Sequence, residues 1–106
     1  MGTLDKTTKR ELLEVILNLV PIGKVVTYSD LANILNTHPR AIAKMLASNE
    51  KLIVVPCHRV VPKDLDVGGY KLGREFKKRL LELEGVRFCK MKICNESLIK
   101  LSDILL

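Results

Sequence analysis

The chain has 106 residues, of which 47% are hydrophobic and 28% are charged, and its formal net charge is +6. This composition is typical of one globular domain, which we expect to span residues 1–106, and it excludes an intrinsically disordered chain. A small basic domain favours polyanionic partners, nucleic acid ahead of an anionic membrane, although a solvated lysine-rich surface has the same net charge.

No apolar run reaches the roughly 18 residues that are needed to span a bilayer, and residues 1–12 lack the apolar centre of a signal peptide. We therefore expect an intracellular, cytoplasmic and nucleoid-associated monomer with no membrane partner. The three cysteines, Cys57, Cys89 and Cys94, are an odd number, so we expect no disulfide framework but free thiols in a reducing compartment.

An amphipathic helix is predicted over residues 7–20, where apolar side chains recur at helical spacing among charged ones. Pro21 ends this helix, and residues 25–26 then favour a short extended segment.

Two short helices follow, and a tight turn joins them. Thr27 and Asp30 have the spacing of a capping box, which starts a helix that ends at Asn36. Pro39 is suited to the first turn of the next helix, which runs to Leu46. Two short helices after a longer one indicate a helix-turn-helix, although on the pattern alone an ordinary helical hairpin is the commoner explanation.

The second half of the chain alternates β-prone runs with loops and helices. The β-prone runs are residues 52–55, 60–61 and 86–93. Residues 62–69 begin with a proline and end with two glycines, and we expect them to form a loop or hairpin in the position of a wing.

A strongly amphipathic helix is predicted over residues 73–84, with Gly85 as its C-cap. Its inward-facing residues are predicted to be Phe76, Leu80, Leu81 and Leu83. Residues 95–106 are predicted to form a final helix that Asn95 caps. The expected fold class is therefore mainly α, a single winged helix-turn-helix-like domain with a small β element.

The stretch that carries chemistry is Pro56 to Val61. Cysteine is nucleophilic as the thiolate, and the adjacent His58 is a candidate base for Cys57. A cysteine beside a histidine is more commonly a packed thiol next to a surface imidazole, so the pair alone does not predict catalysis.

The string from Pro56 to Val60, Pro-Cys-His-Arg-Val, resembles the active-site signature of the O6-alkylguanine-DNA alkyltransferases. The resemblance covers residues 12–88 and concerns the family's C-terminal DNA-binding and catalytic domain. The other segments that carry it are residues 23–32, residues 39–43, Asn49, Gly69 with Tyr70, Gly73, Lys77, and Leu80 to Gly85.

The resemblance implies a reaction centre of three residues. Cys57 accepts the alkyl group, His58 deprotonates Cys57 through a bound water, and Glu84 orients the imidazole and balances its charge.

The resemblance also implies three supporting residues. Asn49 holds the helix-turn-helix against the active-site segment, Tyr70 assists the leaving O6 atom, and Lys77 supports the cysteine loop. Backbone carbonyls near Cys57 and Val60 accept the exocyclic amine of guanine.

On the DNA side, the resemblance implies that Tyr28 presses on the phosphate 3′ of the target and that Arg40 fills the place of the flipped base. Ala41 keeps the recognition helix slim enough for the minor groove, and Lys44 is a candidate phosphate contact. Three further candidates for phosphate contacts are Lys24, Arg74 and Lys78.

Each of these residues also has an ordinary structural explanation. Tyr28 fits a core aromatic, Arg40 an exposed charge, Asn49 a helix C-cap, Tyr70 a hairpin aromatic, and Glu84 an ion pair with Lys77 or Arg79.

The sequence departs from the family in lacking the N-terminal domain of most relatives and in having no zinc-ligand set, so we expect no metal and no cofactor. Cys89 and Cys94 are then packed or incidental thiols. The tail from Lys90 to Leu106 has no counterpart in the family pattern, and it fits either a helix packed on the core or a partner surface.

Three functions remain open. The first is DNA repair by stoichiometric transfer of a methyl or alkyl group from O6 of guanine, in double-stranded DNA entered from the minor groove, to Cys57. The second is a non-enzymatic alkyltransferase-like protein that binds the lesion. The third is a winged-helix transcription factor, which has no use for the Pro-Cys-His-Arg string.

Overall fold

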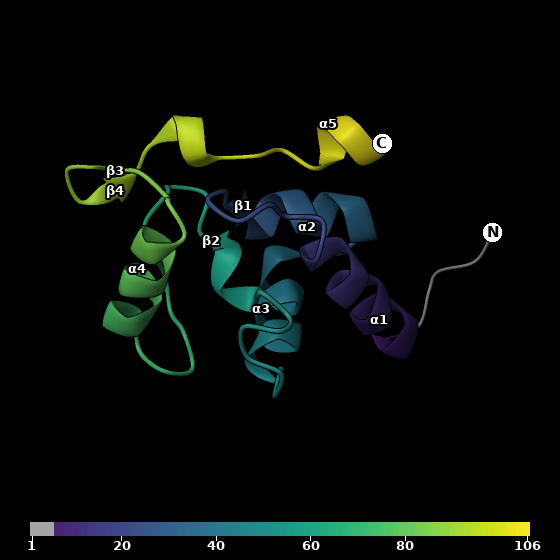
Figure 1. Cartoon of the computed structure of the whole chain (residues 1–106). Coiled ribbons are helices and arrows are strands. Elements are labelled where there is room, and N and C mark those ends of the chain that lie inside the picture. Colours follow the sequence, from purple (N-terminus) through teal and green to yellow (C-terminus); the bar gives the residue numbers. More distant parts are fainter. Residues whose placement is uncertain (1–5) are drawn as a thin grey trace.

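The computed structural model describes residues 6–106, which form the helices and small sheets shown in Figure 1. The first helix, α1, spans Lys6–Leu17 and buries Leu13, Ile16 and Leu17. It ends earlier than predicted, because residues 18–20 continue in tighter turns such as the bond from the Leu19 amide to the Ile16 carbonyl.

The predicted helix-turn-helix is confirmed in α2 (Tyr28–Leu35) and α3 (Pro39–Ala47). Thr27 caps α2, since its hydroxyl accepts the Asp30 amide at 3.1 Å, and Asn36 ends α2 in the left-handed conformation. Of the two hydrogen bonds of the predicted capping box, the one from the Asp30 amide to Thr27 is present and the reciprocal one from the Asp30 side chain is not. The Asp30 carboxylate does not return to the start of α2 but accepts hydrogen bonds from the amide and hydroxyl of Ser102.

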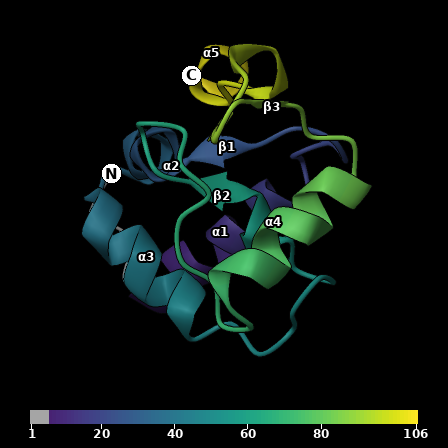
Figure 2. The ribbon, with the colours of Figure 1, turned by 90° about the vertical axis from the view of Figure 1, so that its left-hand side faces the viewer.

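Two short parallel strands, β1 (Val26–Thr27) and β2 (Val60–Val61), connect the helix-turn-helix to the segment that carries Cys57. Both views place α3 and α4 on opposite sides of this pair (Figures 1 and 2). The strand expected at residues 52–55 is a turn closed by a bridge between Leu52 and Val55, with Ile53 at a φ of 71°.

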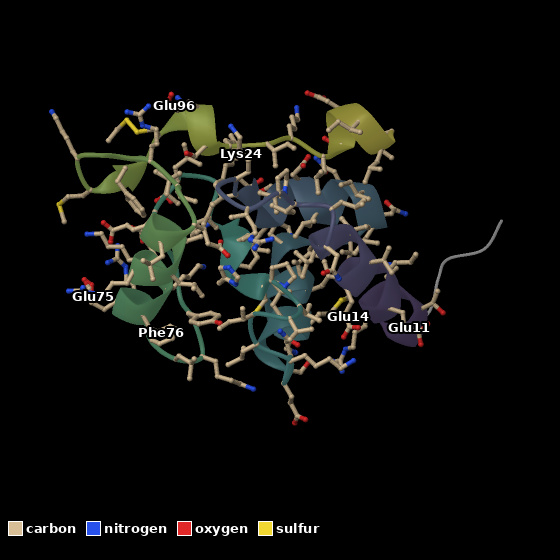
Figure 3. All side chains as sticks on the ribbon, in the orientation of Figure 1. Glu11, Glu14, Lys24, Glu75, Phe76 and Glu96 are labelled. Carbon is tan, nitrogen blue, oxygen red and sulfur yellow. A yellow bond between two sulfur atoms is a disulfide. The ribbon has the colours of Figure 1, made fainter. Side chains whose placement is uncertain are left out.

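Helix α4 spans Arg74–Leu83, and the face that packs on the core agrees with the prediction at Leu81 but not at Phe76 or Leu83. Lys77 and Leu81 are fully buried, whereas Phe76 is 46% exposed and Leu83 is 86% exposed. Figure 3 shows Phe76 on the outer part of the molecule. The hydrophobic pattern missed part of this face because the buried position 77 holds a lysine.

The C-terminal segment departs most from the prediction. Residues 86–93 form an antiparallel hairpin, β3 (Phe88–Cys89) with β4 (Lys92–Ile93), and a disulfide joins Cys89 to Cys94, so the expectation of free thiols at these positions is wrong. Figure 3 shows this bond at the hairpin.

The expected single helix over residues 95–106 is also wrong. It is replaced by a 3-10 turn, η2 (Asn95–Ser97), an extended stretch and a short helix, α5 (Ser102–Leu105). The extended stretch runs beside β1, where Val25 donates to the Ser97 carbonyl and accepts from the Ile99 amide.

The core has two parts, one among α1, α2 and α3 and one beneath α4 and the hairpin. Together they fix the Cys57 segment between the helix-turn-helix and α4. Within residues 6–106, no helix has both the length and the apolar character that crossing a membrane requires.

Candidate functional site

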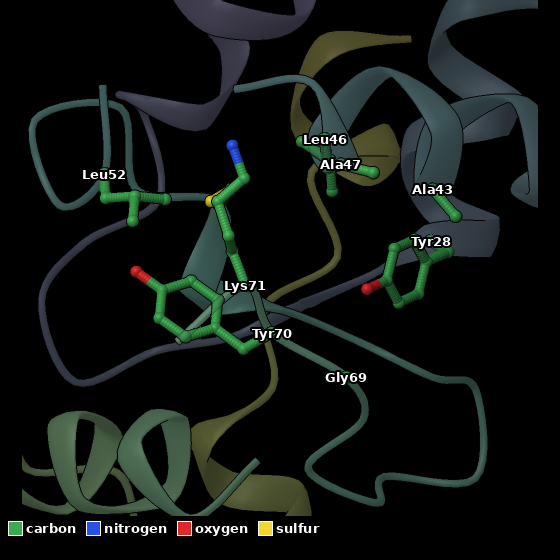
Figure 4. Close-up of a pocket in the computed structure, with 9 residues that line it drawn as sticks. Tyr28, Ala43, Leu46, Ala47, Leu52, Gly69, Tyr70 and Lys71 are labelled. Carbon is green, nitrogen blue, oxygen red and sulfur yellow. The ribbon is translucent and has the colours of Figure 1, made fainter. Parts of the chain in front are cut away.

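A pocket of about 500 Å³ opens between α3 and the loop before α4 (Figure 4). It is lined by Tyr28, Ala43, Leu46, Ala47, Leu52, Cys57, Gly69, Tyr70 and Lys71. Cys57 is only 7% exposed, and it is one of the residues that line the pocket. The thiol is therefore sheltered from bulk solvent and open to a molecule that enters the pocket.

Cys57 begins a tight 3-10 turn, η1 (Cys57–Arg59), whose start is held by the bond from the Cys57 amide to the Val55 carbonyl at 2.7 Å. Asn49, just beyond α3, donates its side-chain amide to both the Val55 carbonyl and the Cys57 sulfur, each at 3.3 Å. Asn49 therefore joins the helix-turn-helix to the cysteine segment, which is the contact expected from the sequence.

His58 is completely buried, and its Nε2 atom lies 2.9 Å from Oε1 of Glu84 at the end of α4. Because a carboxylate only accepts, Nε2 carries the proton and Nδ1 presents a lone pair. Nδ1 is buried and has no hydrogen-bond partner among the described residues. Burial lowers the pKa of His58 more than Glu84 raises it, so the imidazole is neutral near pH 7 and is able to accept a proton.

Arg59 is a residue of the site that the sequence did not single out. Its guanidinium binds both oxygens of Glu84, at 3.1 and 2.8 Å, and the Val20 carbonyl at 2.9 Å. Burial raises the pKa of Glu84, but the hydrogen bonds from Arg59 and His58 outweigh it and hold this pKa below its usual value. Arg59 lies inside the Pro-Cys-His-Arg string, which was the available signal.

Glu84 pairs with neither Lys77 nor Arg79, the partners considered for it from the sequence. Lys77 is buried and donates to the carbonyls of Val60, at 2.7 Å, and Gly69, at 3.2 Å. Burial lowers the pKa of Lys77 to about 8. These bonds tie β2 to the loop before Tyr70. The Val60 carbonyl, which the resemblance implies as an acceptor of the guanine amine, accepts one of them and keeps a second lone pair.

Gly68 allows the loop to approach Lys77 this closely. Its φ is +80°, and a Cβ atom there would lie 2.8 Å from the ring of Pro62 and 3.4 Å from the Lys77 ammonium.

The two tyrosines lie on different sides of the pocket in Figure 4, with Lys71 between them in this view. Tyr70 stacks on Phe76 and meets the His58 ring edge-on, with centroids 6.3 and 6.4 Å away. Its hydroxyl is buried and has no hydrogen-bond partner among the described residues. Burial raises the pKa values of both Tyr70 and Tyr28, and the nearby Cys57 raises them further. Both hydroxyls therefore keep their protons and remain hydrogen-bond donors.

The candidate DNA-binding residues on α3 lie along one helix, and Arg40 and Lys44 are exposed while Ala41 is half-buried. Ala43 and Ala47 of the same helix reach the pocket.

The other phosphate-contact candidates have partners within the chain. Lys24 donates to the Glu96 carbonyl, Arg74 pairs with Asp66, and the Lys78 ammonium lies 5.7 Å from the centre of the Phe88 ring. Residues 6–106 contain no group of three or more histidine, cysteine or acidic side chains that could hold a metal ion.

A family model, curated proteins and solved structures that resemble this chain concern DNA methyltransferases of the same kind. A family model described as 6-O-methylguanine DNA methyltransferase, DNA binding domain, matches residues 7–86. A methylated-DNA–protein-cysteine methyltransferase of Methanopyrus kandleri is 53% identical over 76 residues, which are 72% of this chain and 56% of that protein. The chain spans about half the length of the curated relatives that it matches.

Solved structures agree with this similarity. The O6-methylguanine-DNA methyltransferase of the archaeon Pyrococcus kodakaraensis superimposes with a TM-score of 0.68 at 49% identity, over 73% of this chain and 46% of that one. An S. pombe ATL in complex with DNA gives a TM-score of 0.76 over 92% of this chain and 99% of its own, at 20% identity, which is a likeness of fold alone.

Proposed function

Because the chain belongs to the 6-O-methylguanine DNA methyltransferase family through its DNA binding domain, we propose that it repairs DNA by direct transfer. In this proposal a methyl or larger alkyl group moves from O6 of guanine in double-stranded DNA to Cys57 of the same molecule. The observation that carries the proposal is Cys57 on the pocket wall, followed in the chain by a buried neutral imidazole that a carboxylate holds in place.

The proposed transfer needs a thiolate, and His58 is the base that supplies it. The proton of Cys57 passes through a bridging water to Nδ1, the ring nitrogen with a free lone pair. Glu84, fixed by Arg59, stabilises the imidazolium that forms. The thiolate then attacks the alkyl carbon, the carbon–sulfur bond forms, and the carbon–oxygen bond to guanine breaks.

The electron pair of the broken bond remains on guanine, which takes up the proton that left Cys57. Tyr70 is suited to donate a hydrogen bond to O6 while negative charge develops there. Its hydroxyl is protonated, buried and without a hydrogen-bond partner among the described residues. Atoms and charge then balance without a cofactor. The thioether is stable, so one molecule acts once.

Guanine O6 is inaccessible inside a duplex, so the nucleotide must be flipped into the pocket. We assign the flipping to α3 and the start of α2. Arg40 replaces the extruded base in the stack, Ala41 lets the helix enter the minor groove, Lys44 contacts phosphate, and Tyr28 presses on the backbone at the pocket mouth.

The test follows a radiolabelled methyl group from an O6-methylguanine duplex under single-turnover conditions. We expect label to appear on the protein in a one-to-one ratio and not to appear on Cys57→Ser. Tight lesion binding without transfer in the wild type, unchanged in Cys57→Ser, would favour the lesion-binding alternative. Affinity that depends on the DNA sequence and not on the lesion would favour a transcription factor.

A further inference from the structure

Lys71 is the only charged residue among the nine that line the pocket, and the other eight are apolar, aromatic or small residues and the acceptor cysteine. In Figure 4 its side chain rises between Leu52 and the α3 residues Leu46 and Ala47. A methyl group is uncharged, so its transfer does not require a cation on this otherwise apolar pocket wall.

The Lys71 ammonium has capacity left for a ligand. It donates to the Asn49 carbonyl at 3.1 Å, and it forms no ion pair with any carboxylate in the part of the chain that the structure describes. An ammonium has three donors, so this single bond to a neutral acceptor leaves two of them and the whole charge unmatched.

One residue contacts both the Lys71 ammonium and the acceptor sulfur. Asn49 accepts from Lys71 with its backbone carbonyl and donates to the Cys57 sulfur with its side-chain amide. The ammonium and the sulfur therefore belong to the same pocket lining and share a bonding partner.

We infer that Lys71 forms an anion subsite of the acceptor pocket, which selects guanine adducts whose O6 substituent ends in a carboxylate over neutral adducts of the same size. This inference rests on the proposed transfer function and names a substrate class for it. The long, flexible stem of lysine allows the ammonium to meet such a carboxylate while it keeps its bond to Asn49. Lys71 is an exposed member of the pocket lining, and a hydrogen bond between two charged groups is stronger than one between neutral groups.

The test compares two duplexes that differ only in the end of the adduct, O6-carboxymethylguanine and its amide, O6-carbamoylmethylguanine. For each, the single-turnover rate of Cys57 alkylation is measured with the full chain as wild type, Lys71→Met and Lys63→Met. Lys63 is the matched control, because it is an exposed lysine outside the pocket lining.

We expect the wild type and Lys63→Met to prefer the carboxylate by about tenfold, and Lys71→Met to lose that preference. A preference that survives in Lys71→Met would overturn the inference. So would an equal fall in both rates, which would indicate that Lys71 contacts a DNA phosphate.

The same ratio is measured by equilibrium binding of both duplexes to Cys57→Ser and to Cys57→Ser/Lys71→Met. If the wild type alkylates Cys57 with neither duplex, the proposed function fails, and the binding ratio alone decides on the subsite. A carboxylate preference that depends on Lys71 supports it, and equal affinities contradict it.

Discussion

The Nε2 atom of His58 lies 2.9 Å from Oε1 of Glu84, although the two residues are 26 positions apart in the chain. The same carboxylate is held by the two-point contact of Arg59, so its position is fixed from a second side. This arrangement turns the free lone pair of the buried imidazole away from the carboxylate and makes the ring available as a base.

The first prediction concerns this carboxylate. Glu84→Gln removes the charge that stabilises the imidazolium, and we expect the single-turnover transfer rate to fall by about tenfold or more. The variant also leaves Arg59 without its charged partner, so we expect a loss of about 1–3 kcal/mol in the free energy of unfolding. Transfer is measured well below the unfolding temperature. Glu82→Gln, an exposed change on the same helix, is the control, and a Glu84→Gln rate equal to the Glu82→Gln rate would refute the assignment.

The second prediction concerns the pH dependence of transfer. Burial holds the pKa of His58 below its ordinary value of 6.5, so the ring is neutral above that pH and becomes protonated only at lower pH. We expect the transfer rate to fall with decreasing pH, with a midpoint below 6.5. In Glu84→Gln the imidazolium loses its stabilising charge, and the midpoint should move lower still. A midpoint at or above 6.5 in the wild type would contradict the neutral buried base.

The third prediction concerns Arg40. This side chain is exposed at the start of α3, so Arg40→Ala should change the free energy of unfolding by no more than about 0.5 kcal/mol. We expect transfer from an O6-methylguanine duplex to slow by about tenfold, because the flipped state loses the side chain that fills the gap in the base stack.

A free O6-methylguanine base needs no flipping and is the control substrate for Arg40→Ala. Its rate should equal that of the wild type. Normal repair of the duplex by this variant would remove Arg40 from the mechanism, and equal slowing on the free base would show a defect in the pocket instead.

The fourth prediction concerns the disulfide. The bond closes a short loop, since Cys89 and Cys94 are five positions apart in the chain, so we expect it to contribute about 2 kcal/mol to the free energy of unfolding. Adding reductant should lower the stability of the wild type by that amount and leave Cys89→Ser/Cys94→Ser unchanged. Thiol titration verifies that the bond has opened. A fully reduced wild type with undiminished stability would contradict this contribution.

The helix-turn-helix was predictable because its signals are local. The Thr27 cap, the turn at Asn36 and the proline that opens α3 each act within a few residues. The pairing of His58 with Glu84 was predictable only from the family resemblance, since nothing in the spacing of 26 residues requires it. The proximity of Asn49 to Cys57 came from the same source.

The C-terminal tail was not predictable, because its partners are distant in the sequence. Ser102 bonds to Asp30 across 72 positions, and residues 97–99 take their conformation from Val25. The same applies to Lys77, whose burial depends on two carbonyls that only the folded chain brings to it. Hydrophobic periodicity treats a lysine as a surface residue, and it therefore placed Phe76 and Leu83 in the core where the structure has Lys77, although Leu81 was assigned correctly.

The central claim is that the sulfur of Cys57 is the final alkyl acceptor, and peptide mass spectrometry tests it most directly. The wild-type chain is incubated with one equivalent of O6-methylguanine duplex and digested, and the peptide that contains Cys57 is weighed and fragmented. The account predicts a single added methyl group on Cys57, with unmodified Cys89 and Cys94 and guanine restored in the DNA. An unmodified Cys57 peptide from protein that has bound the duplex would contradict it.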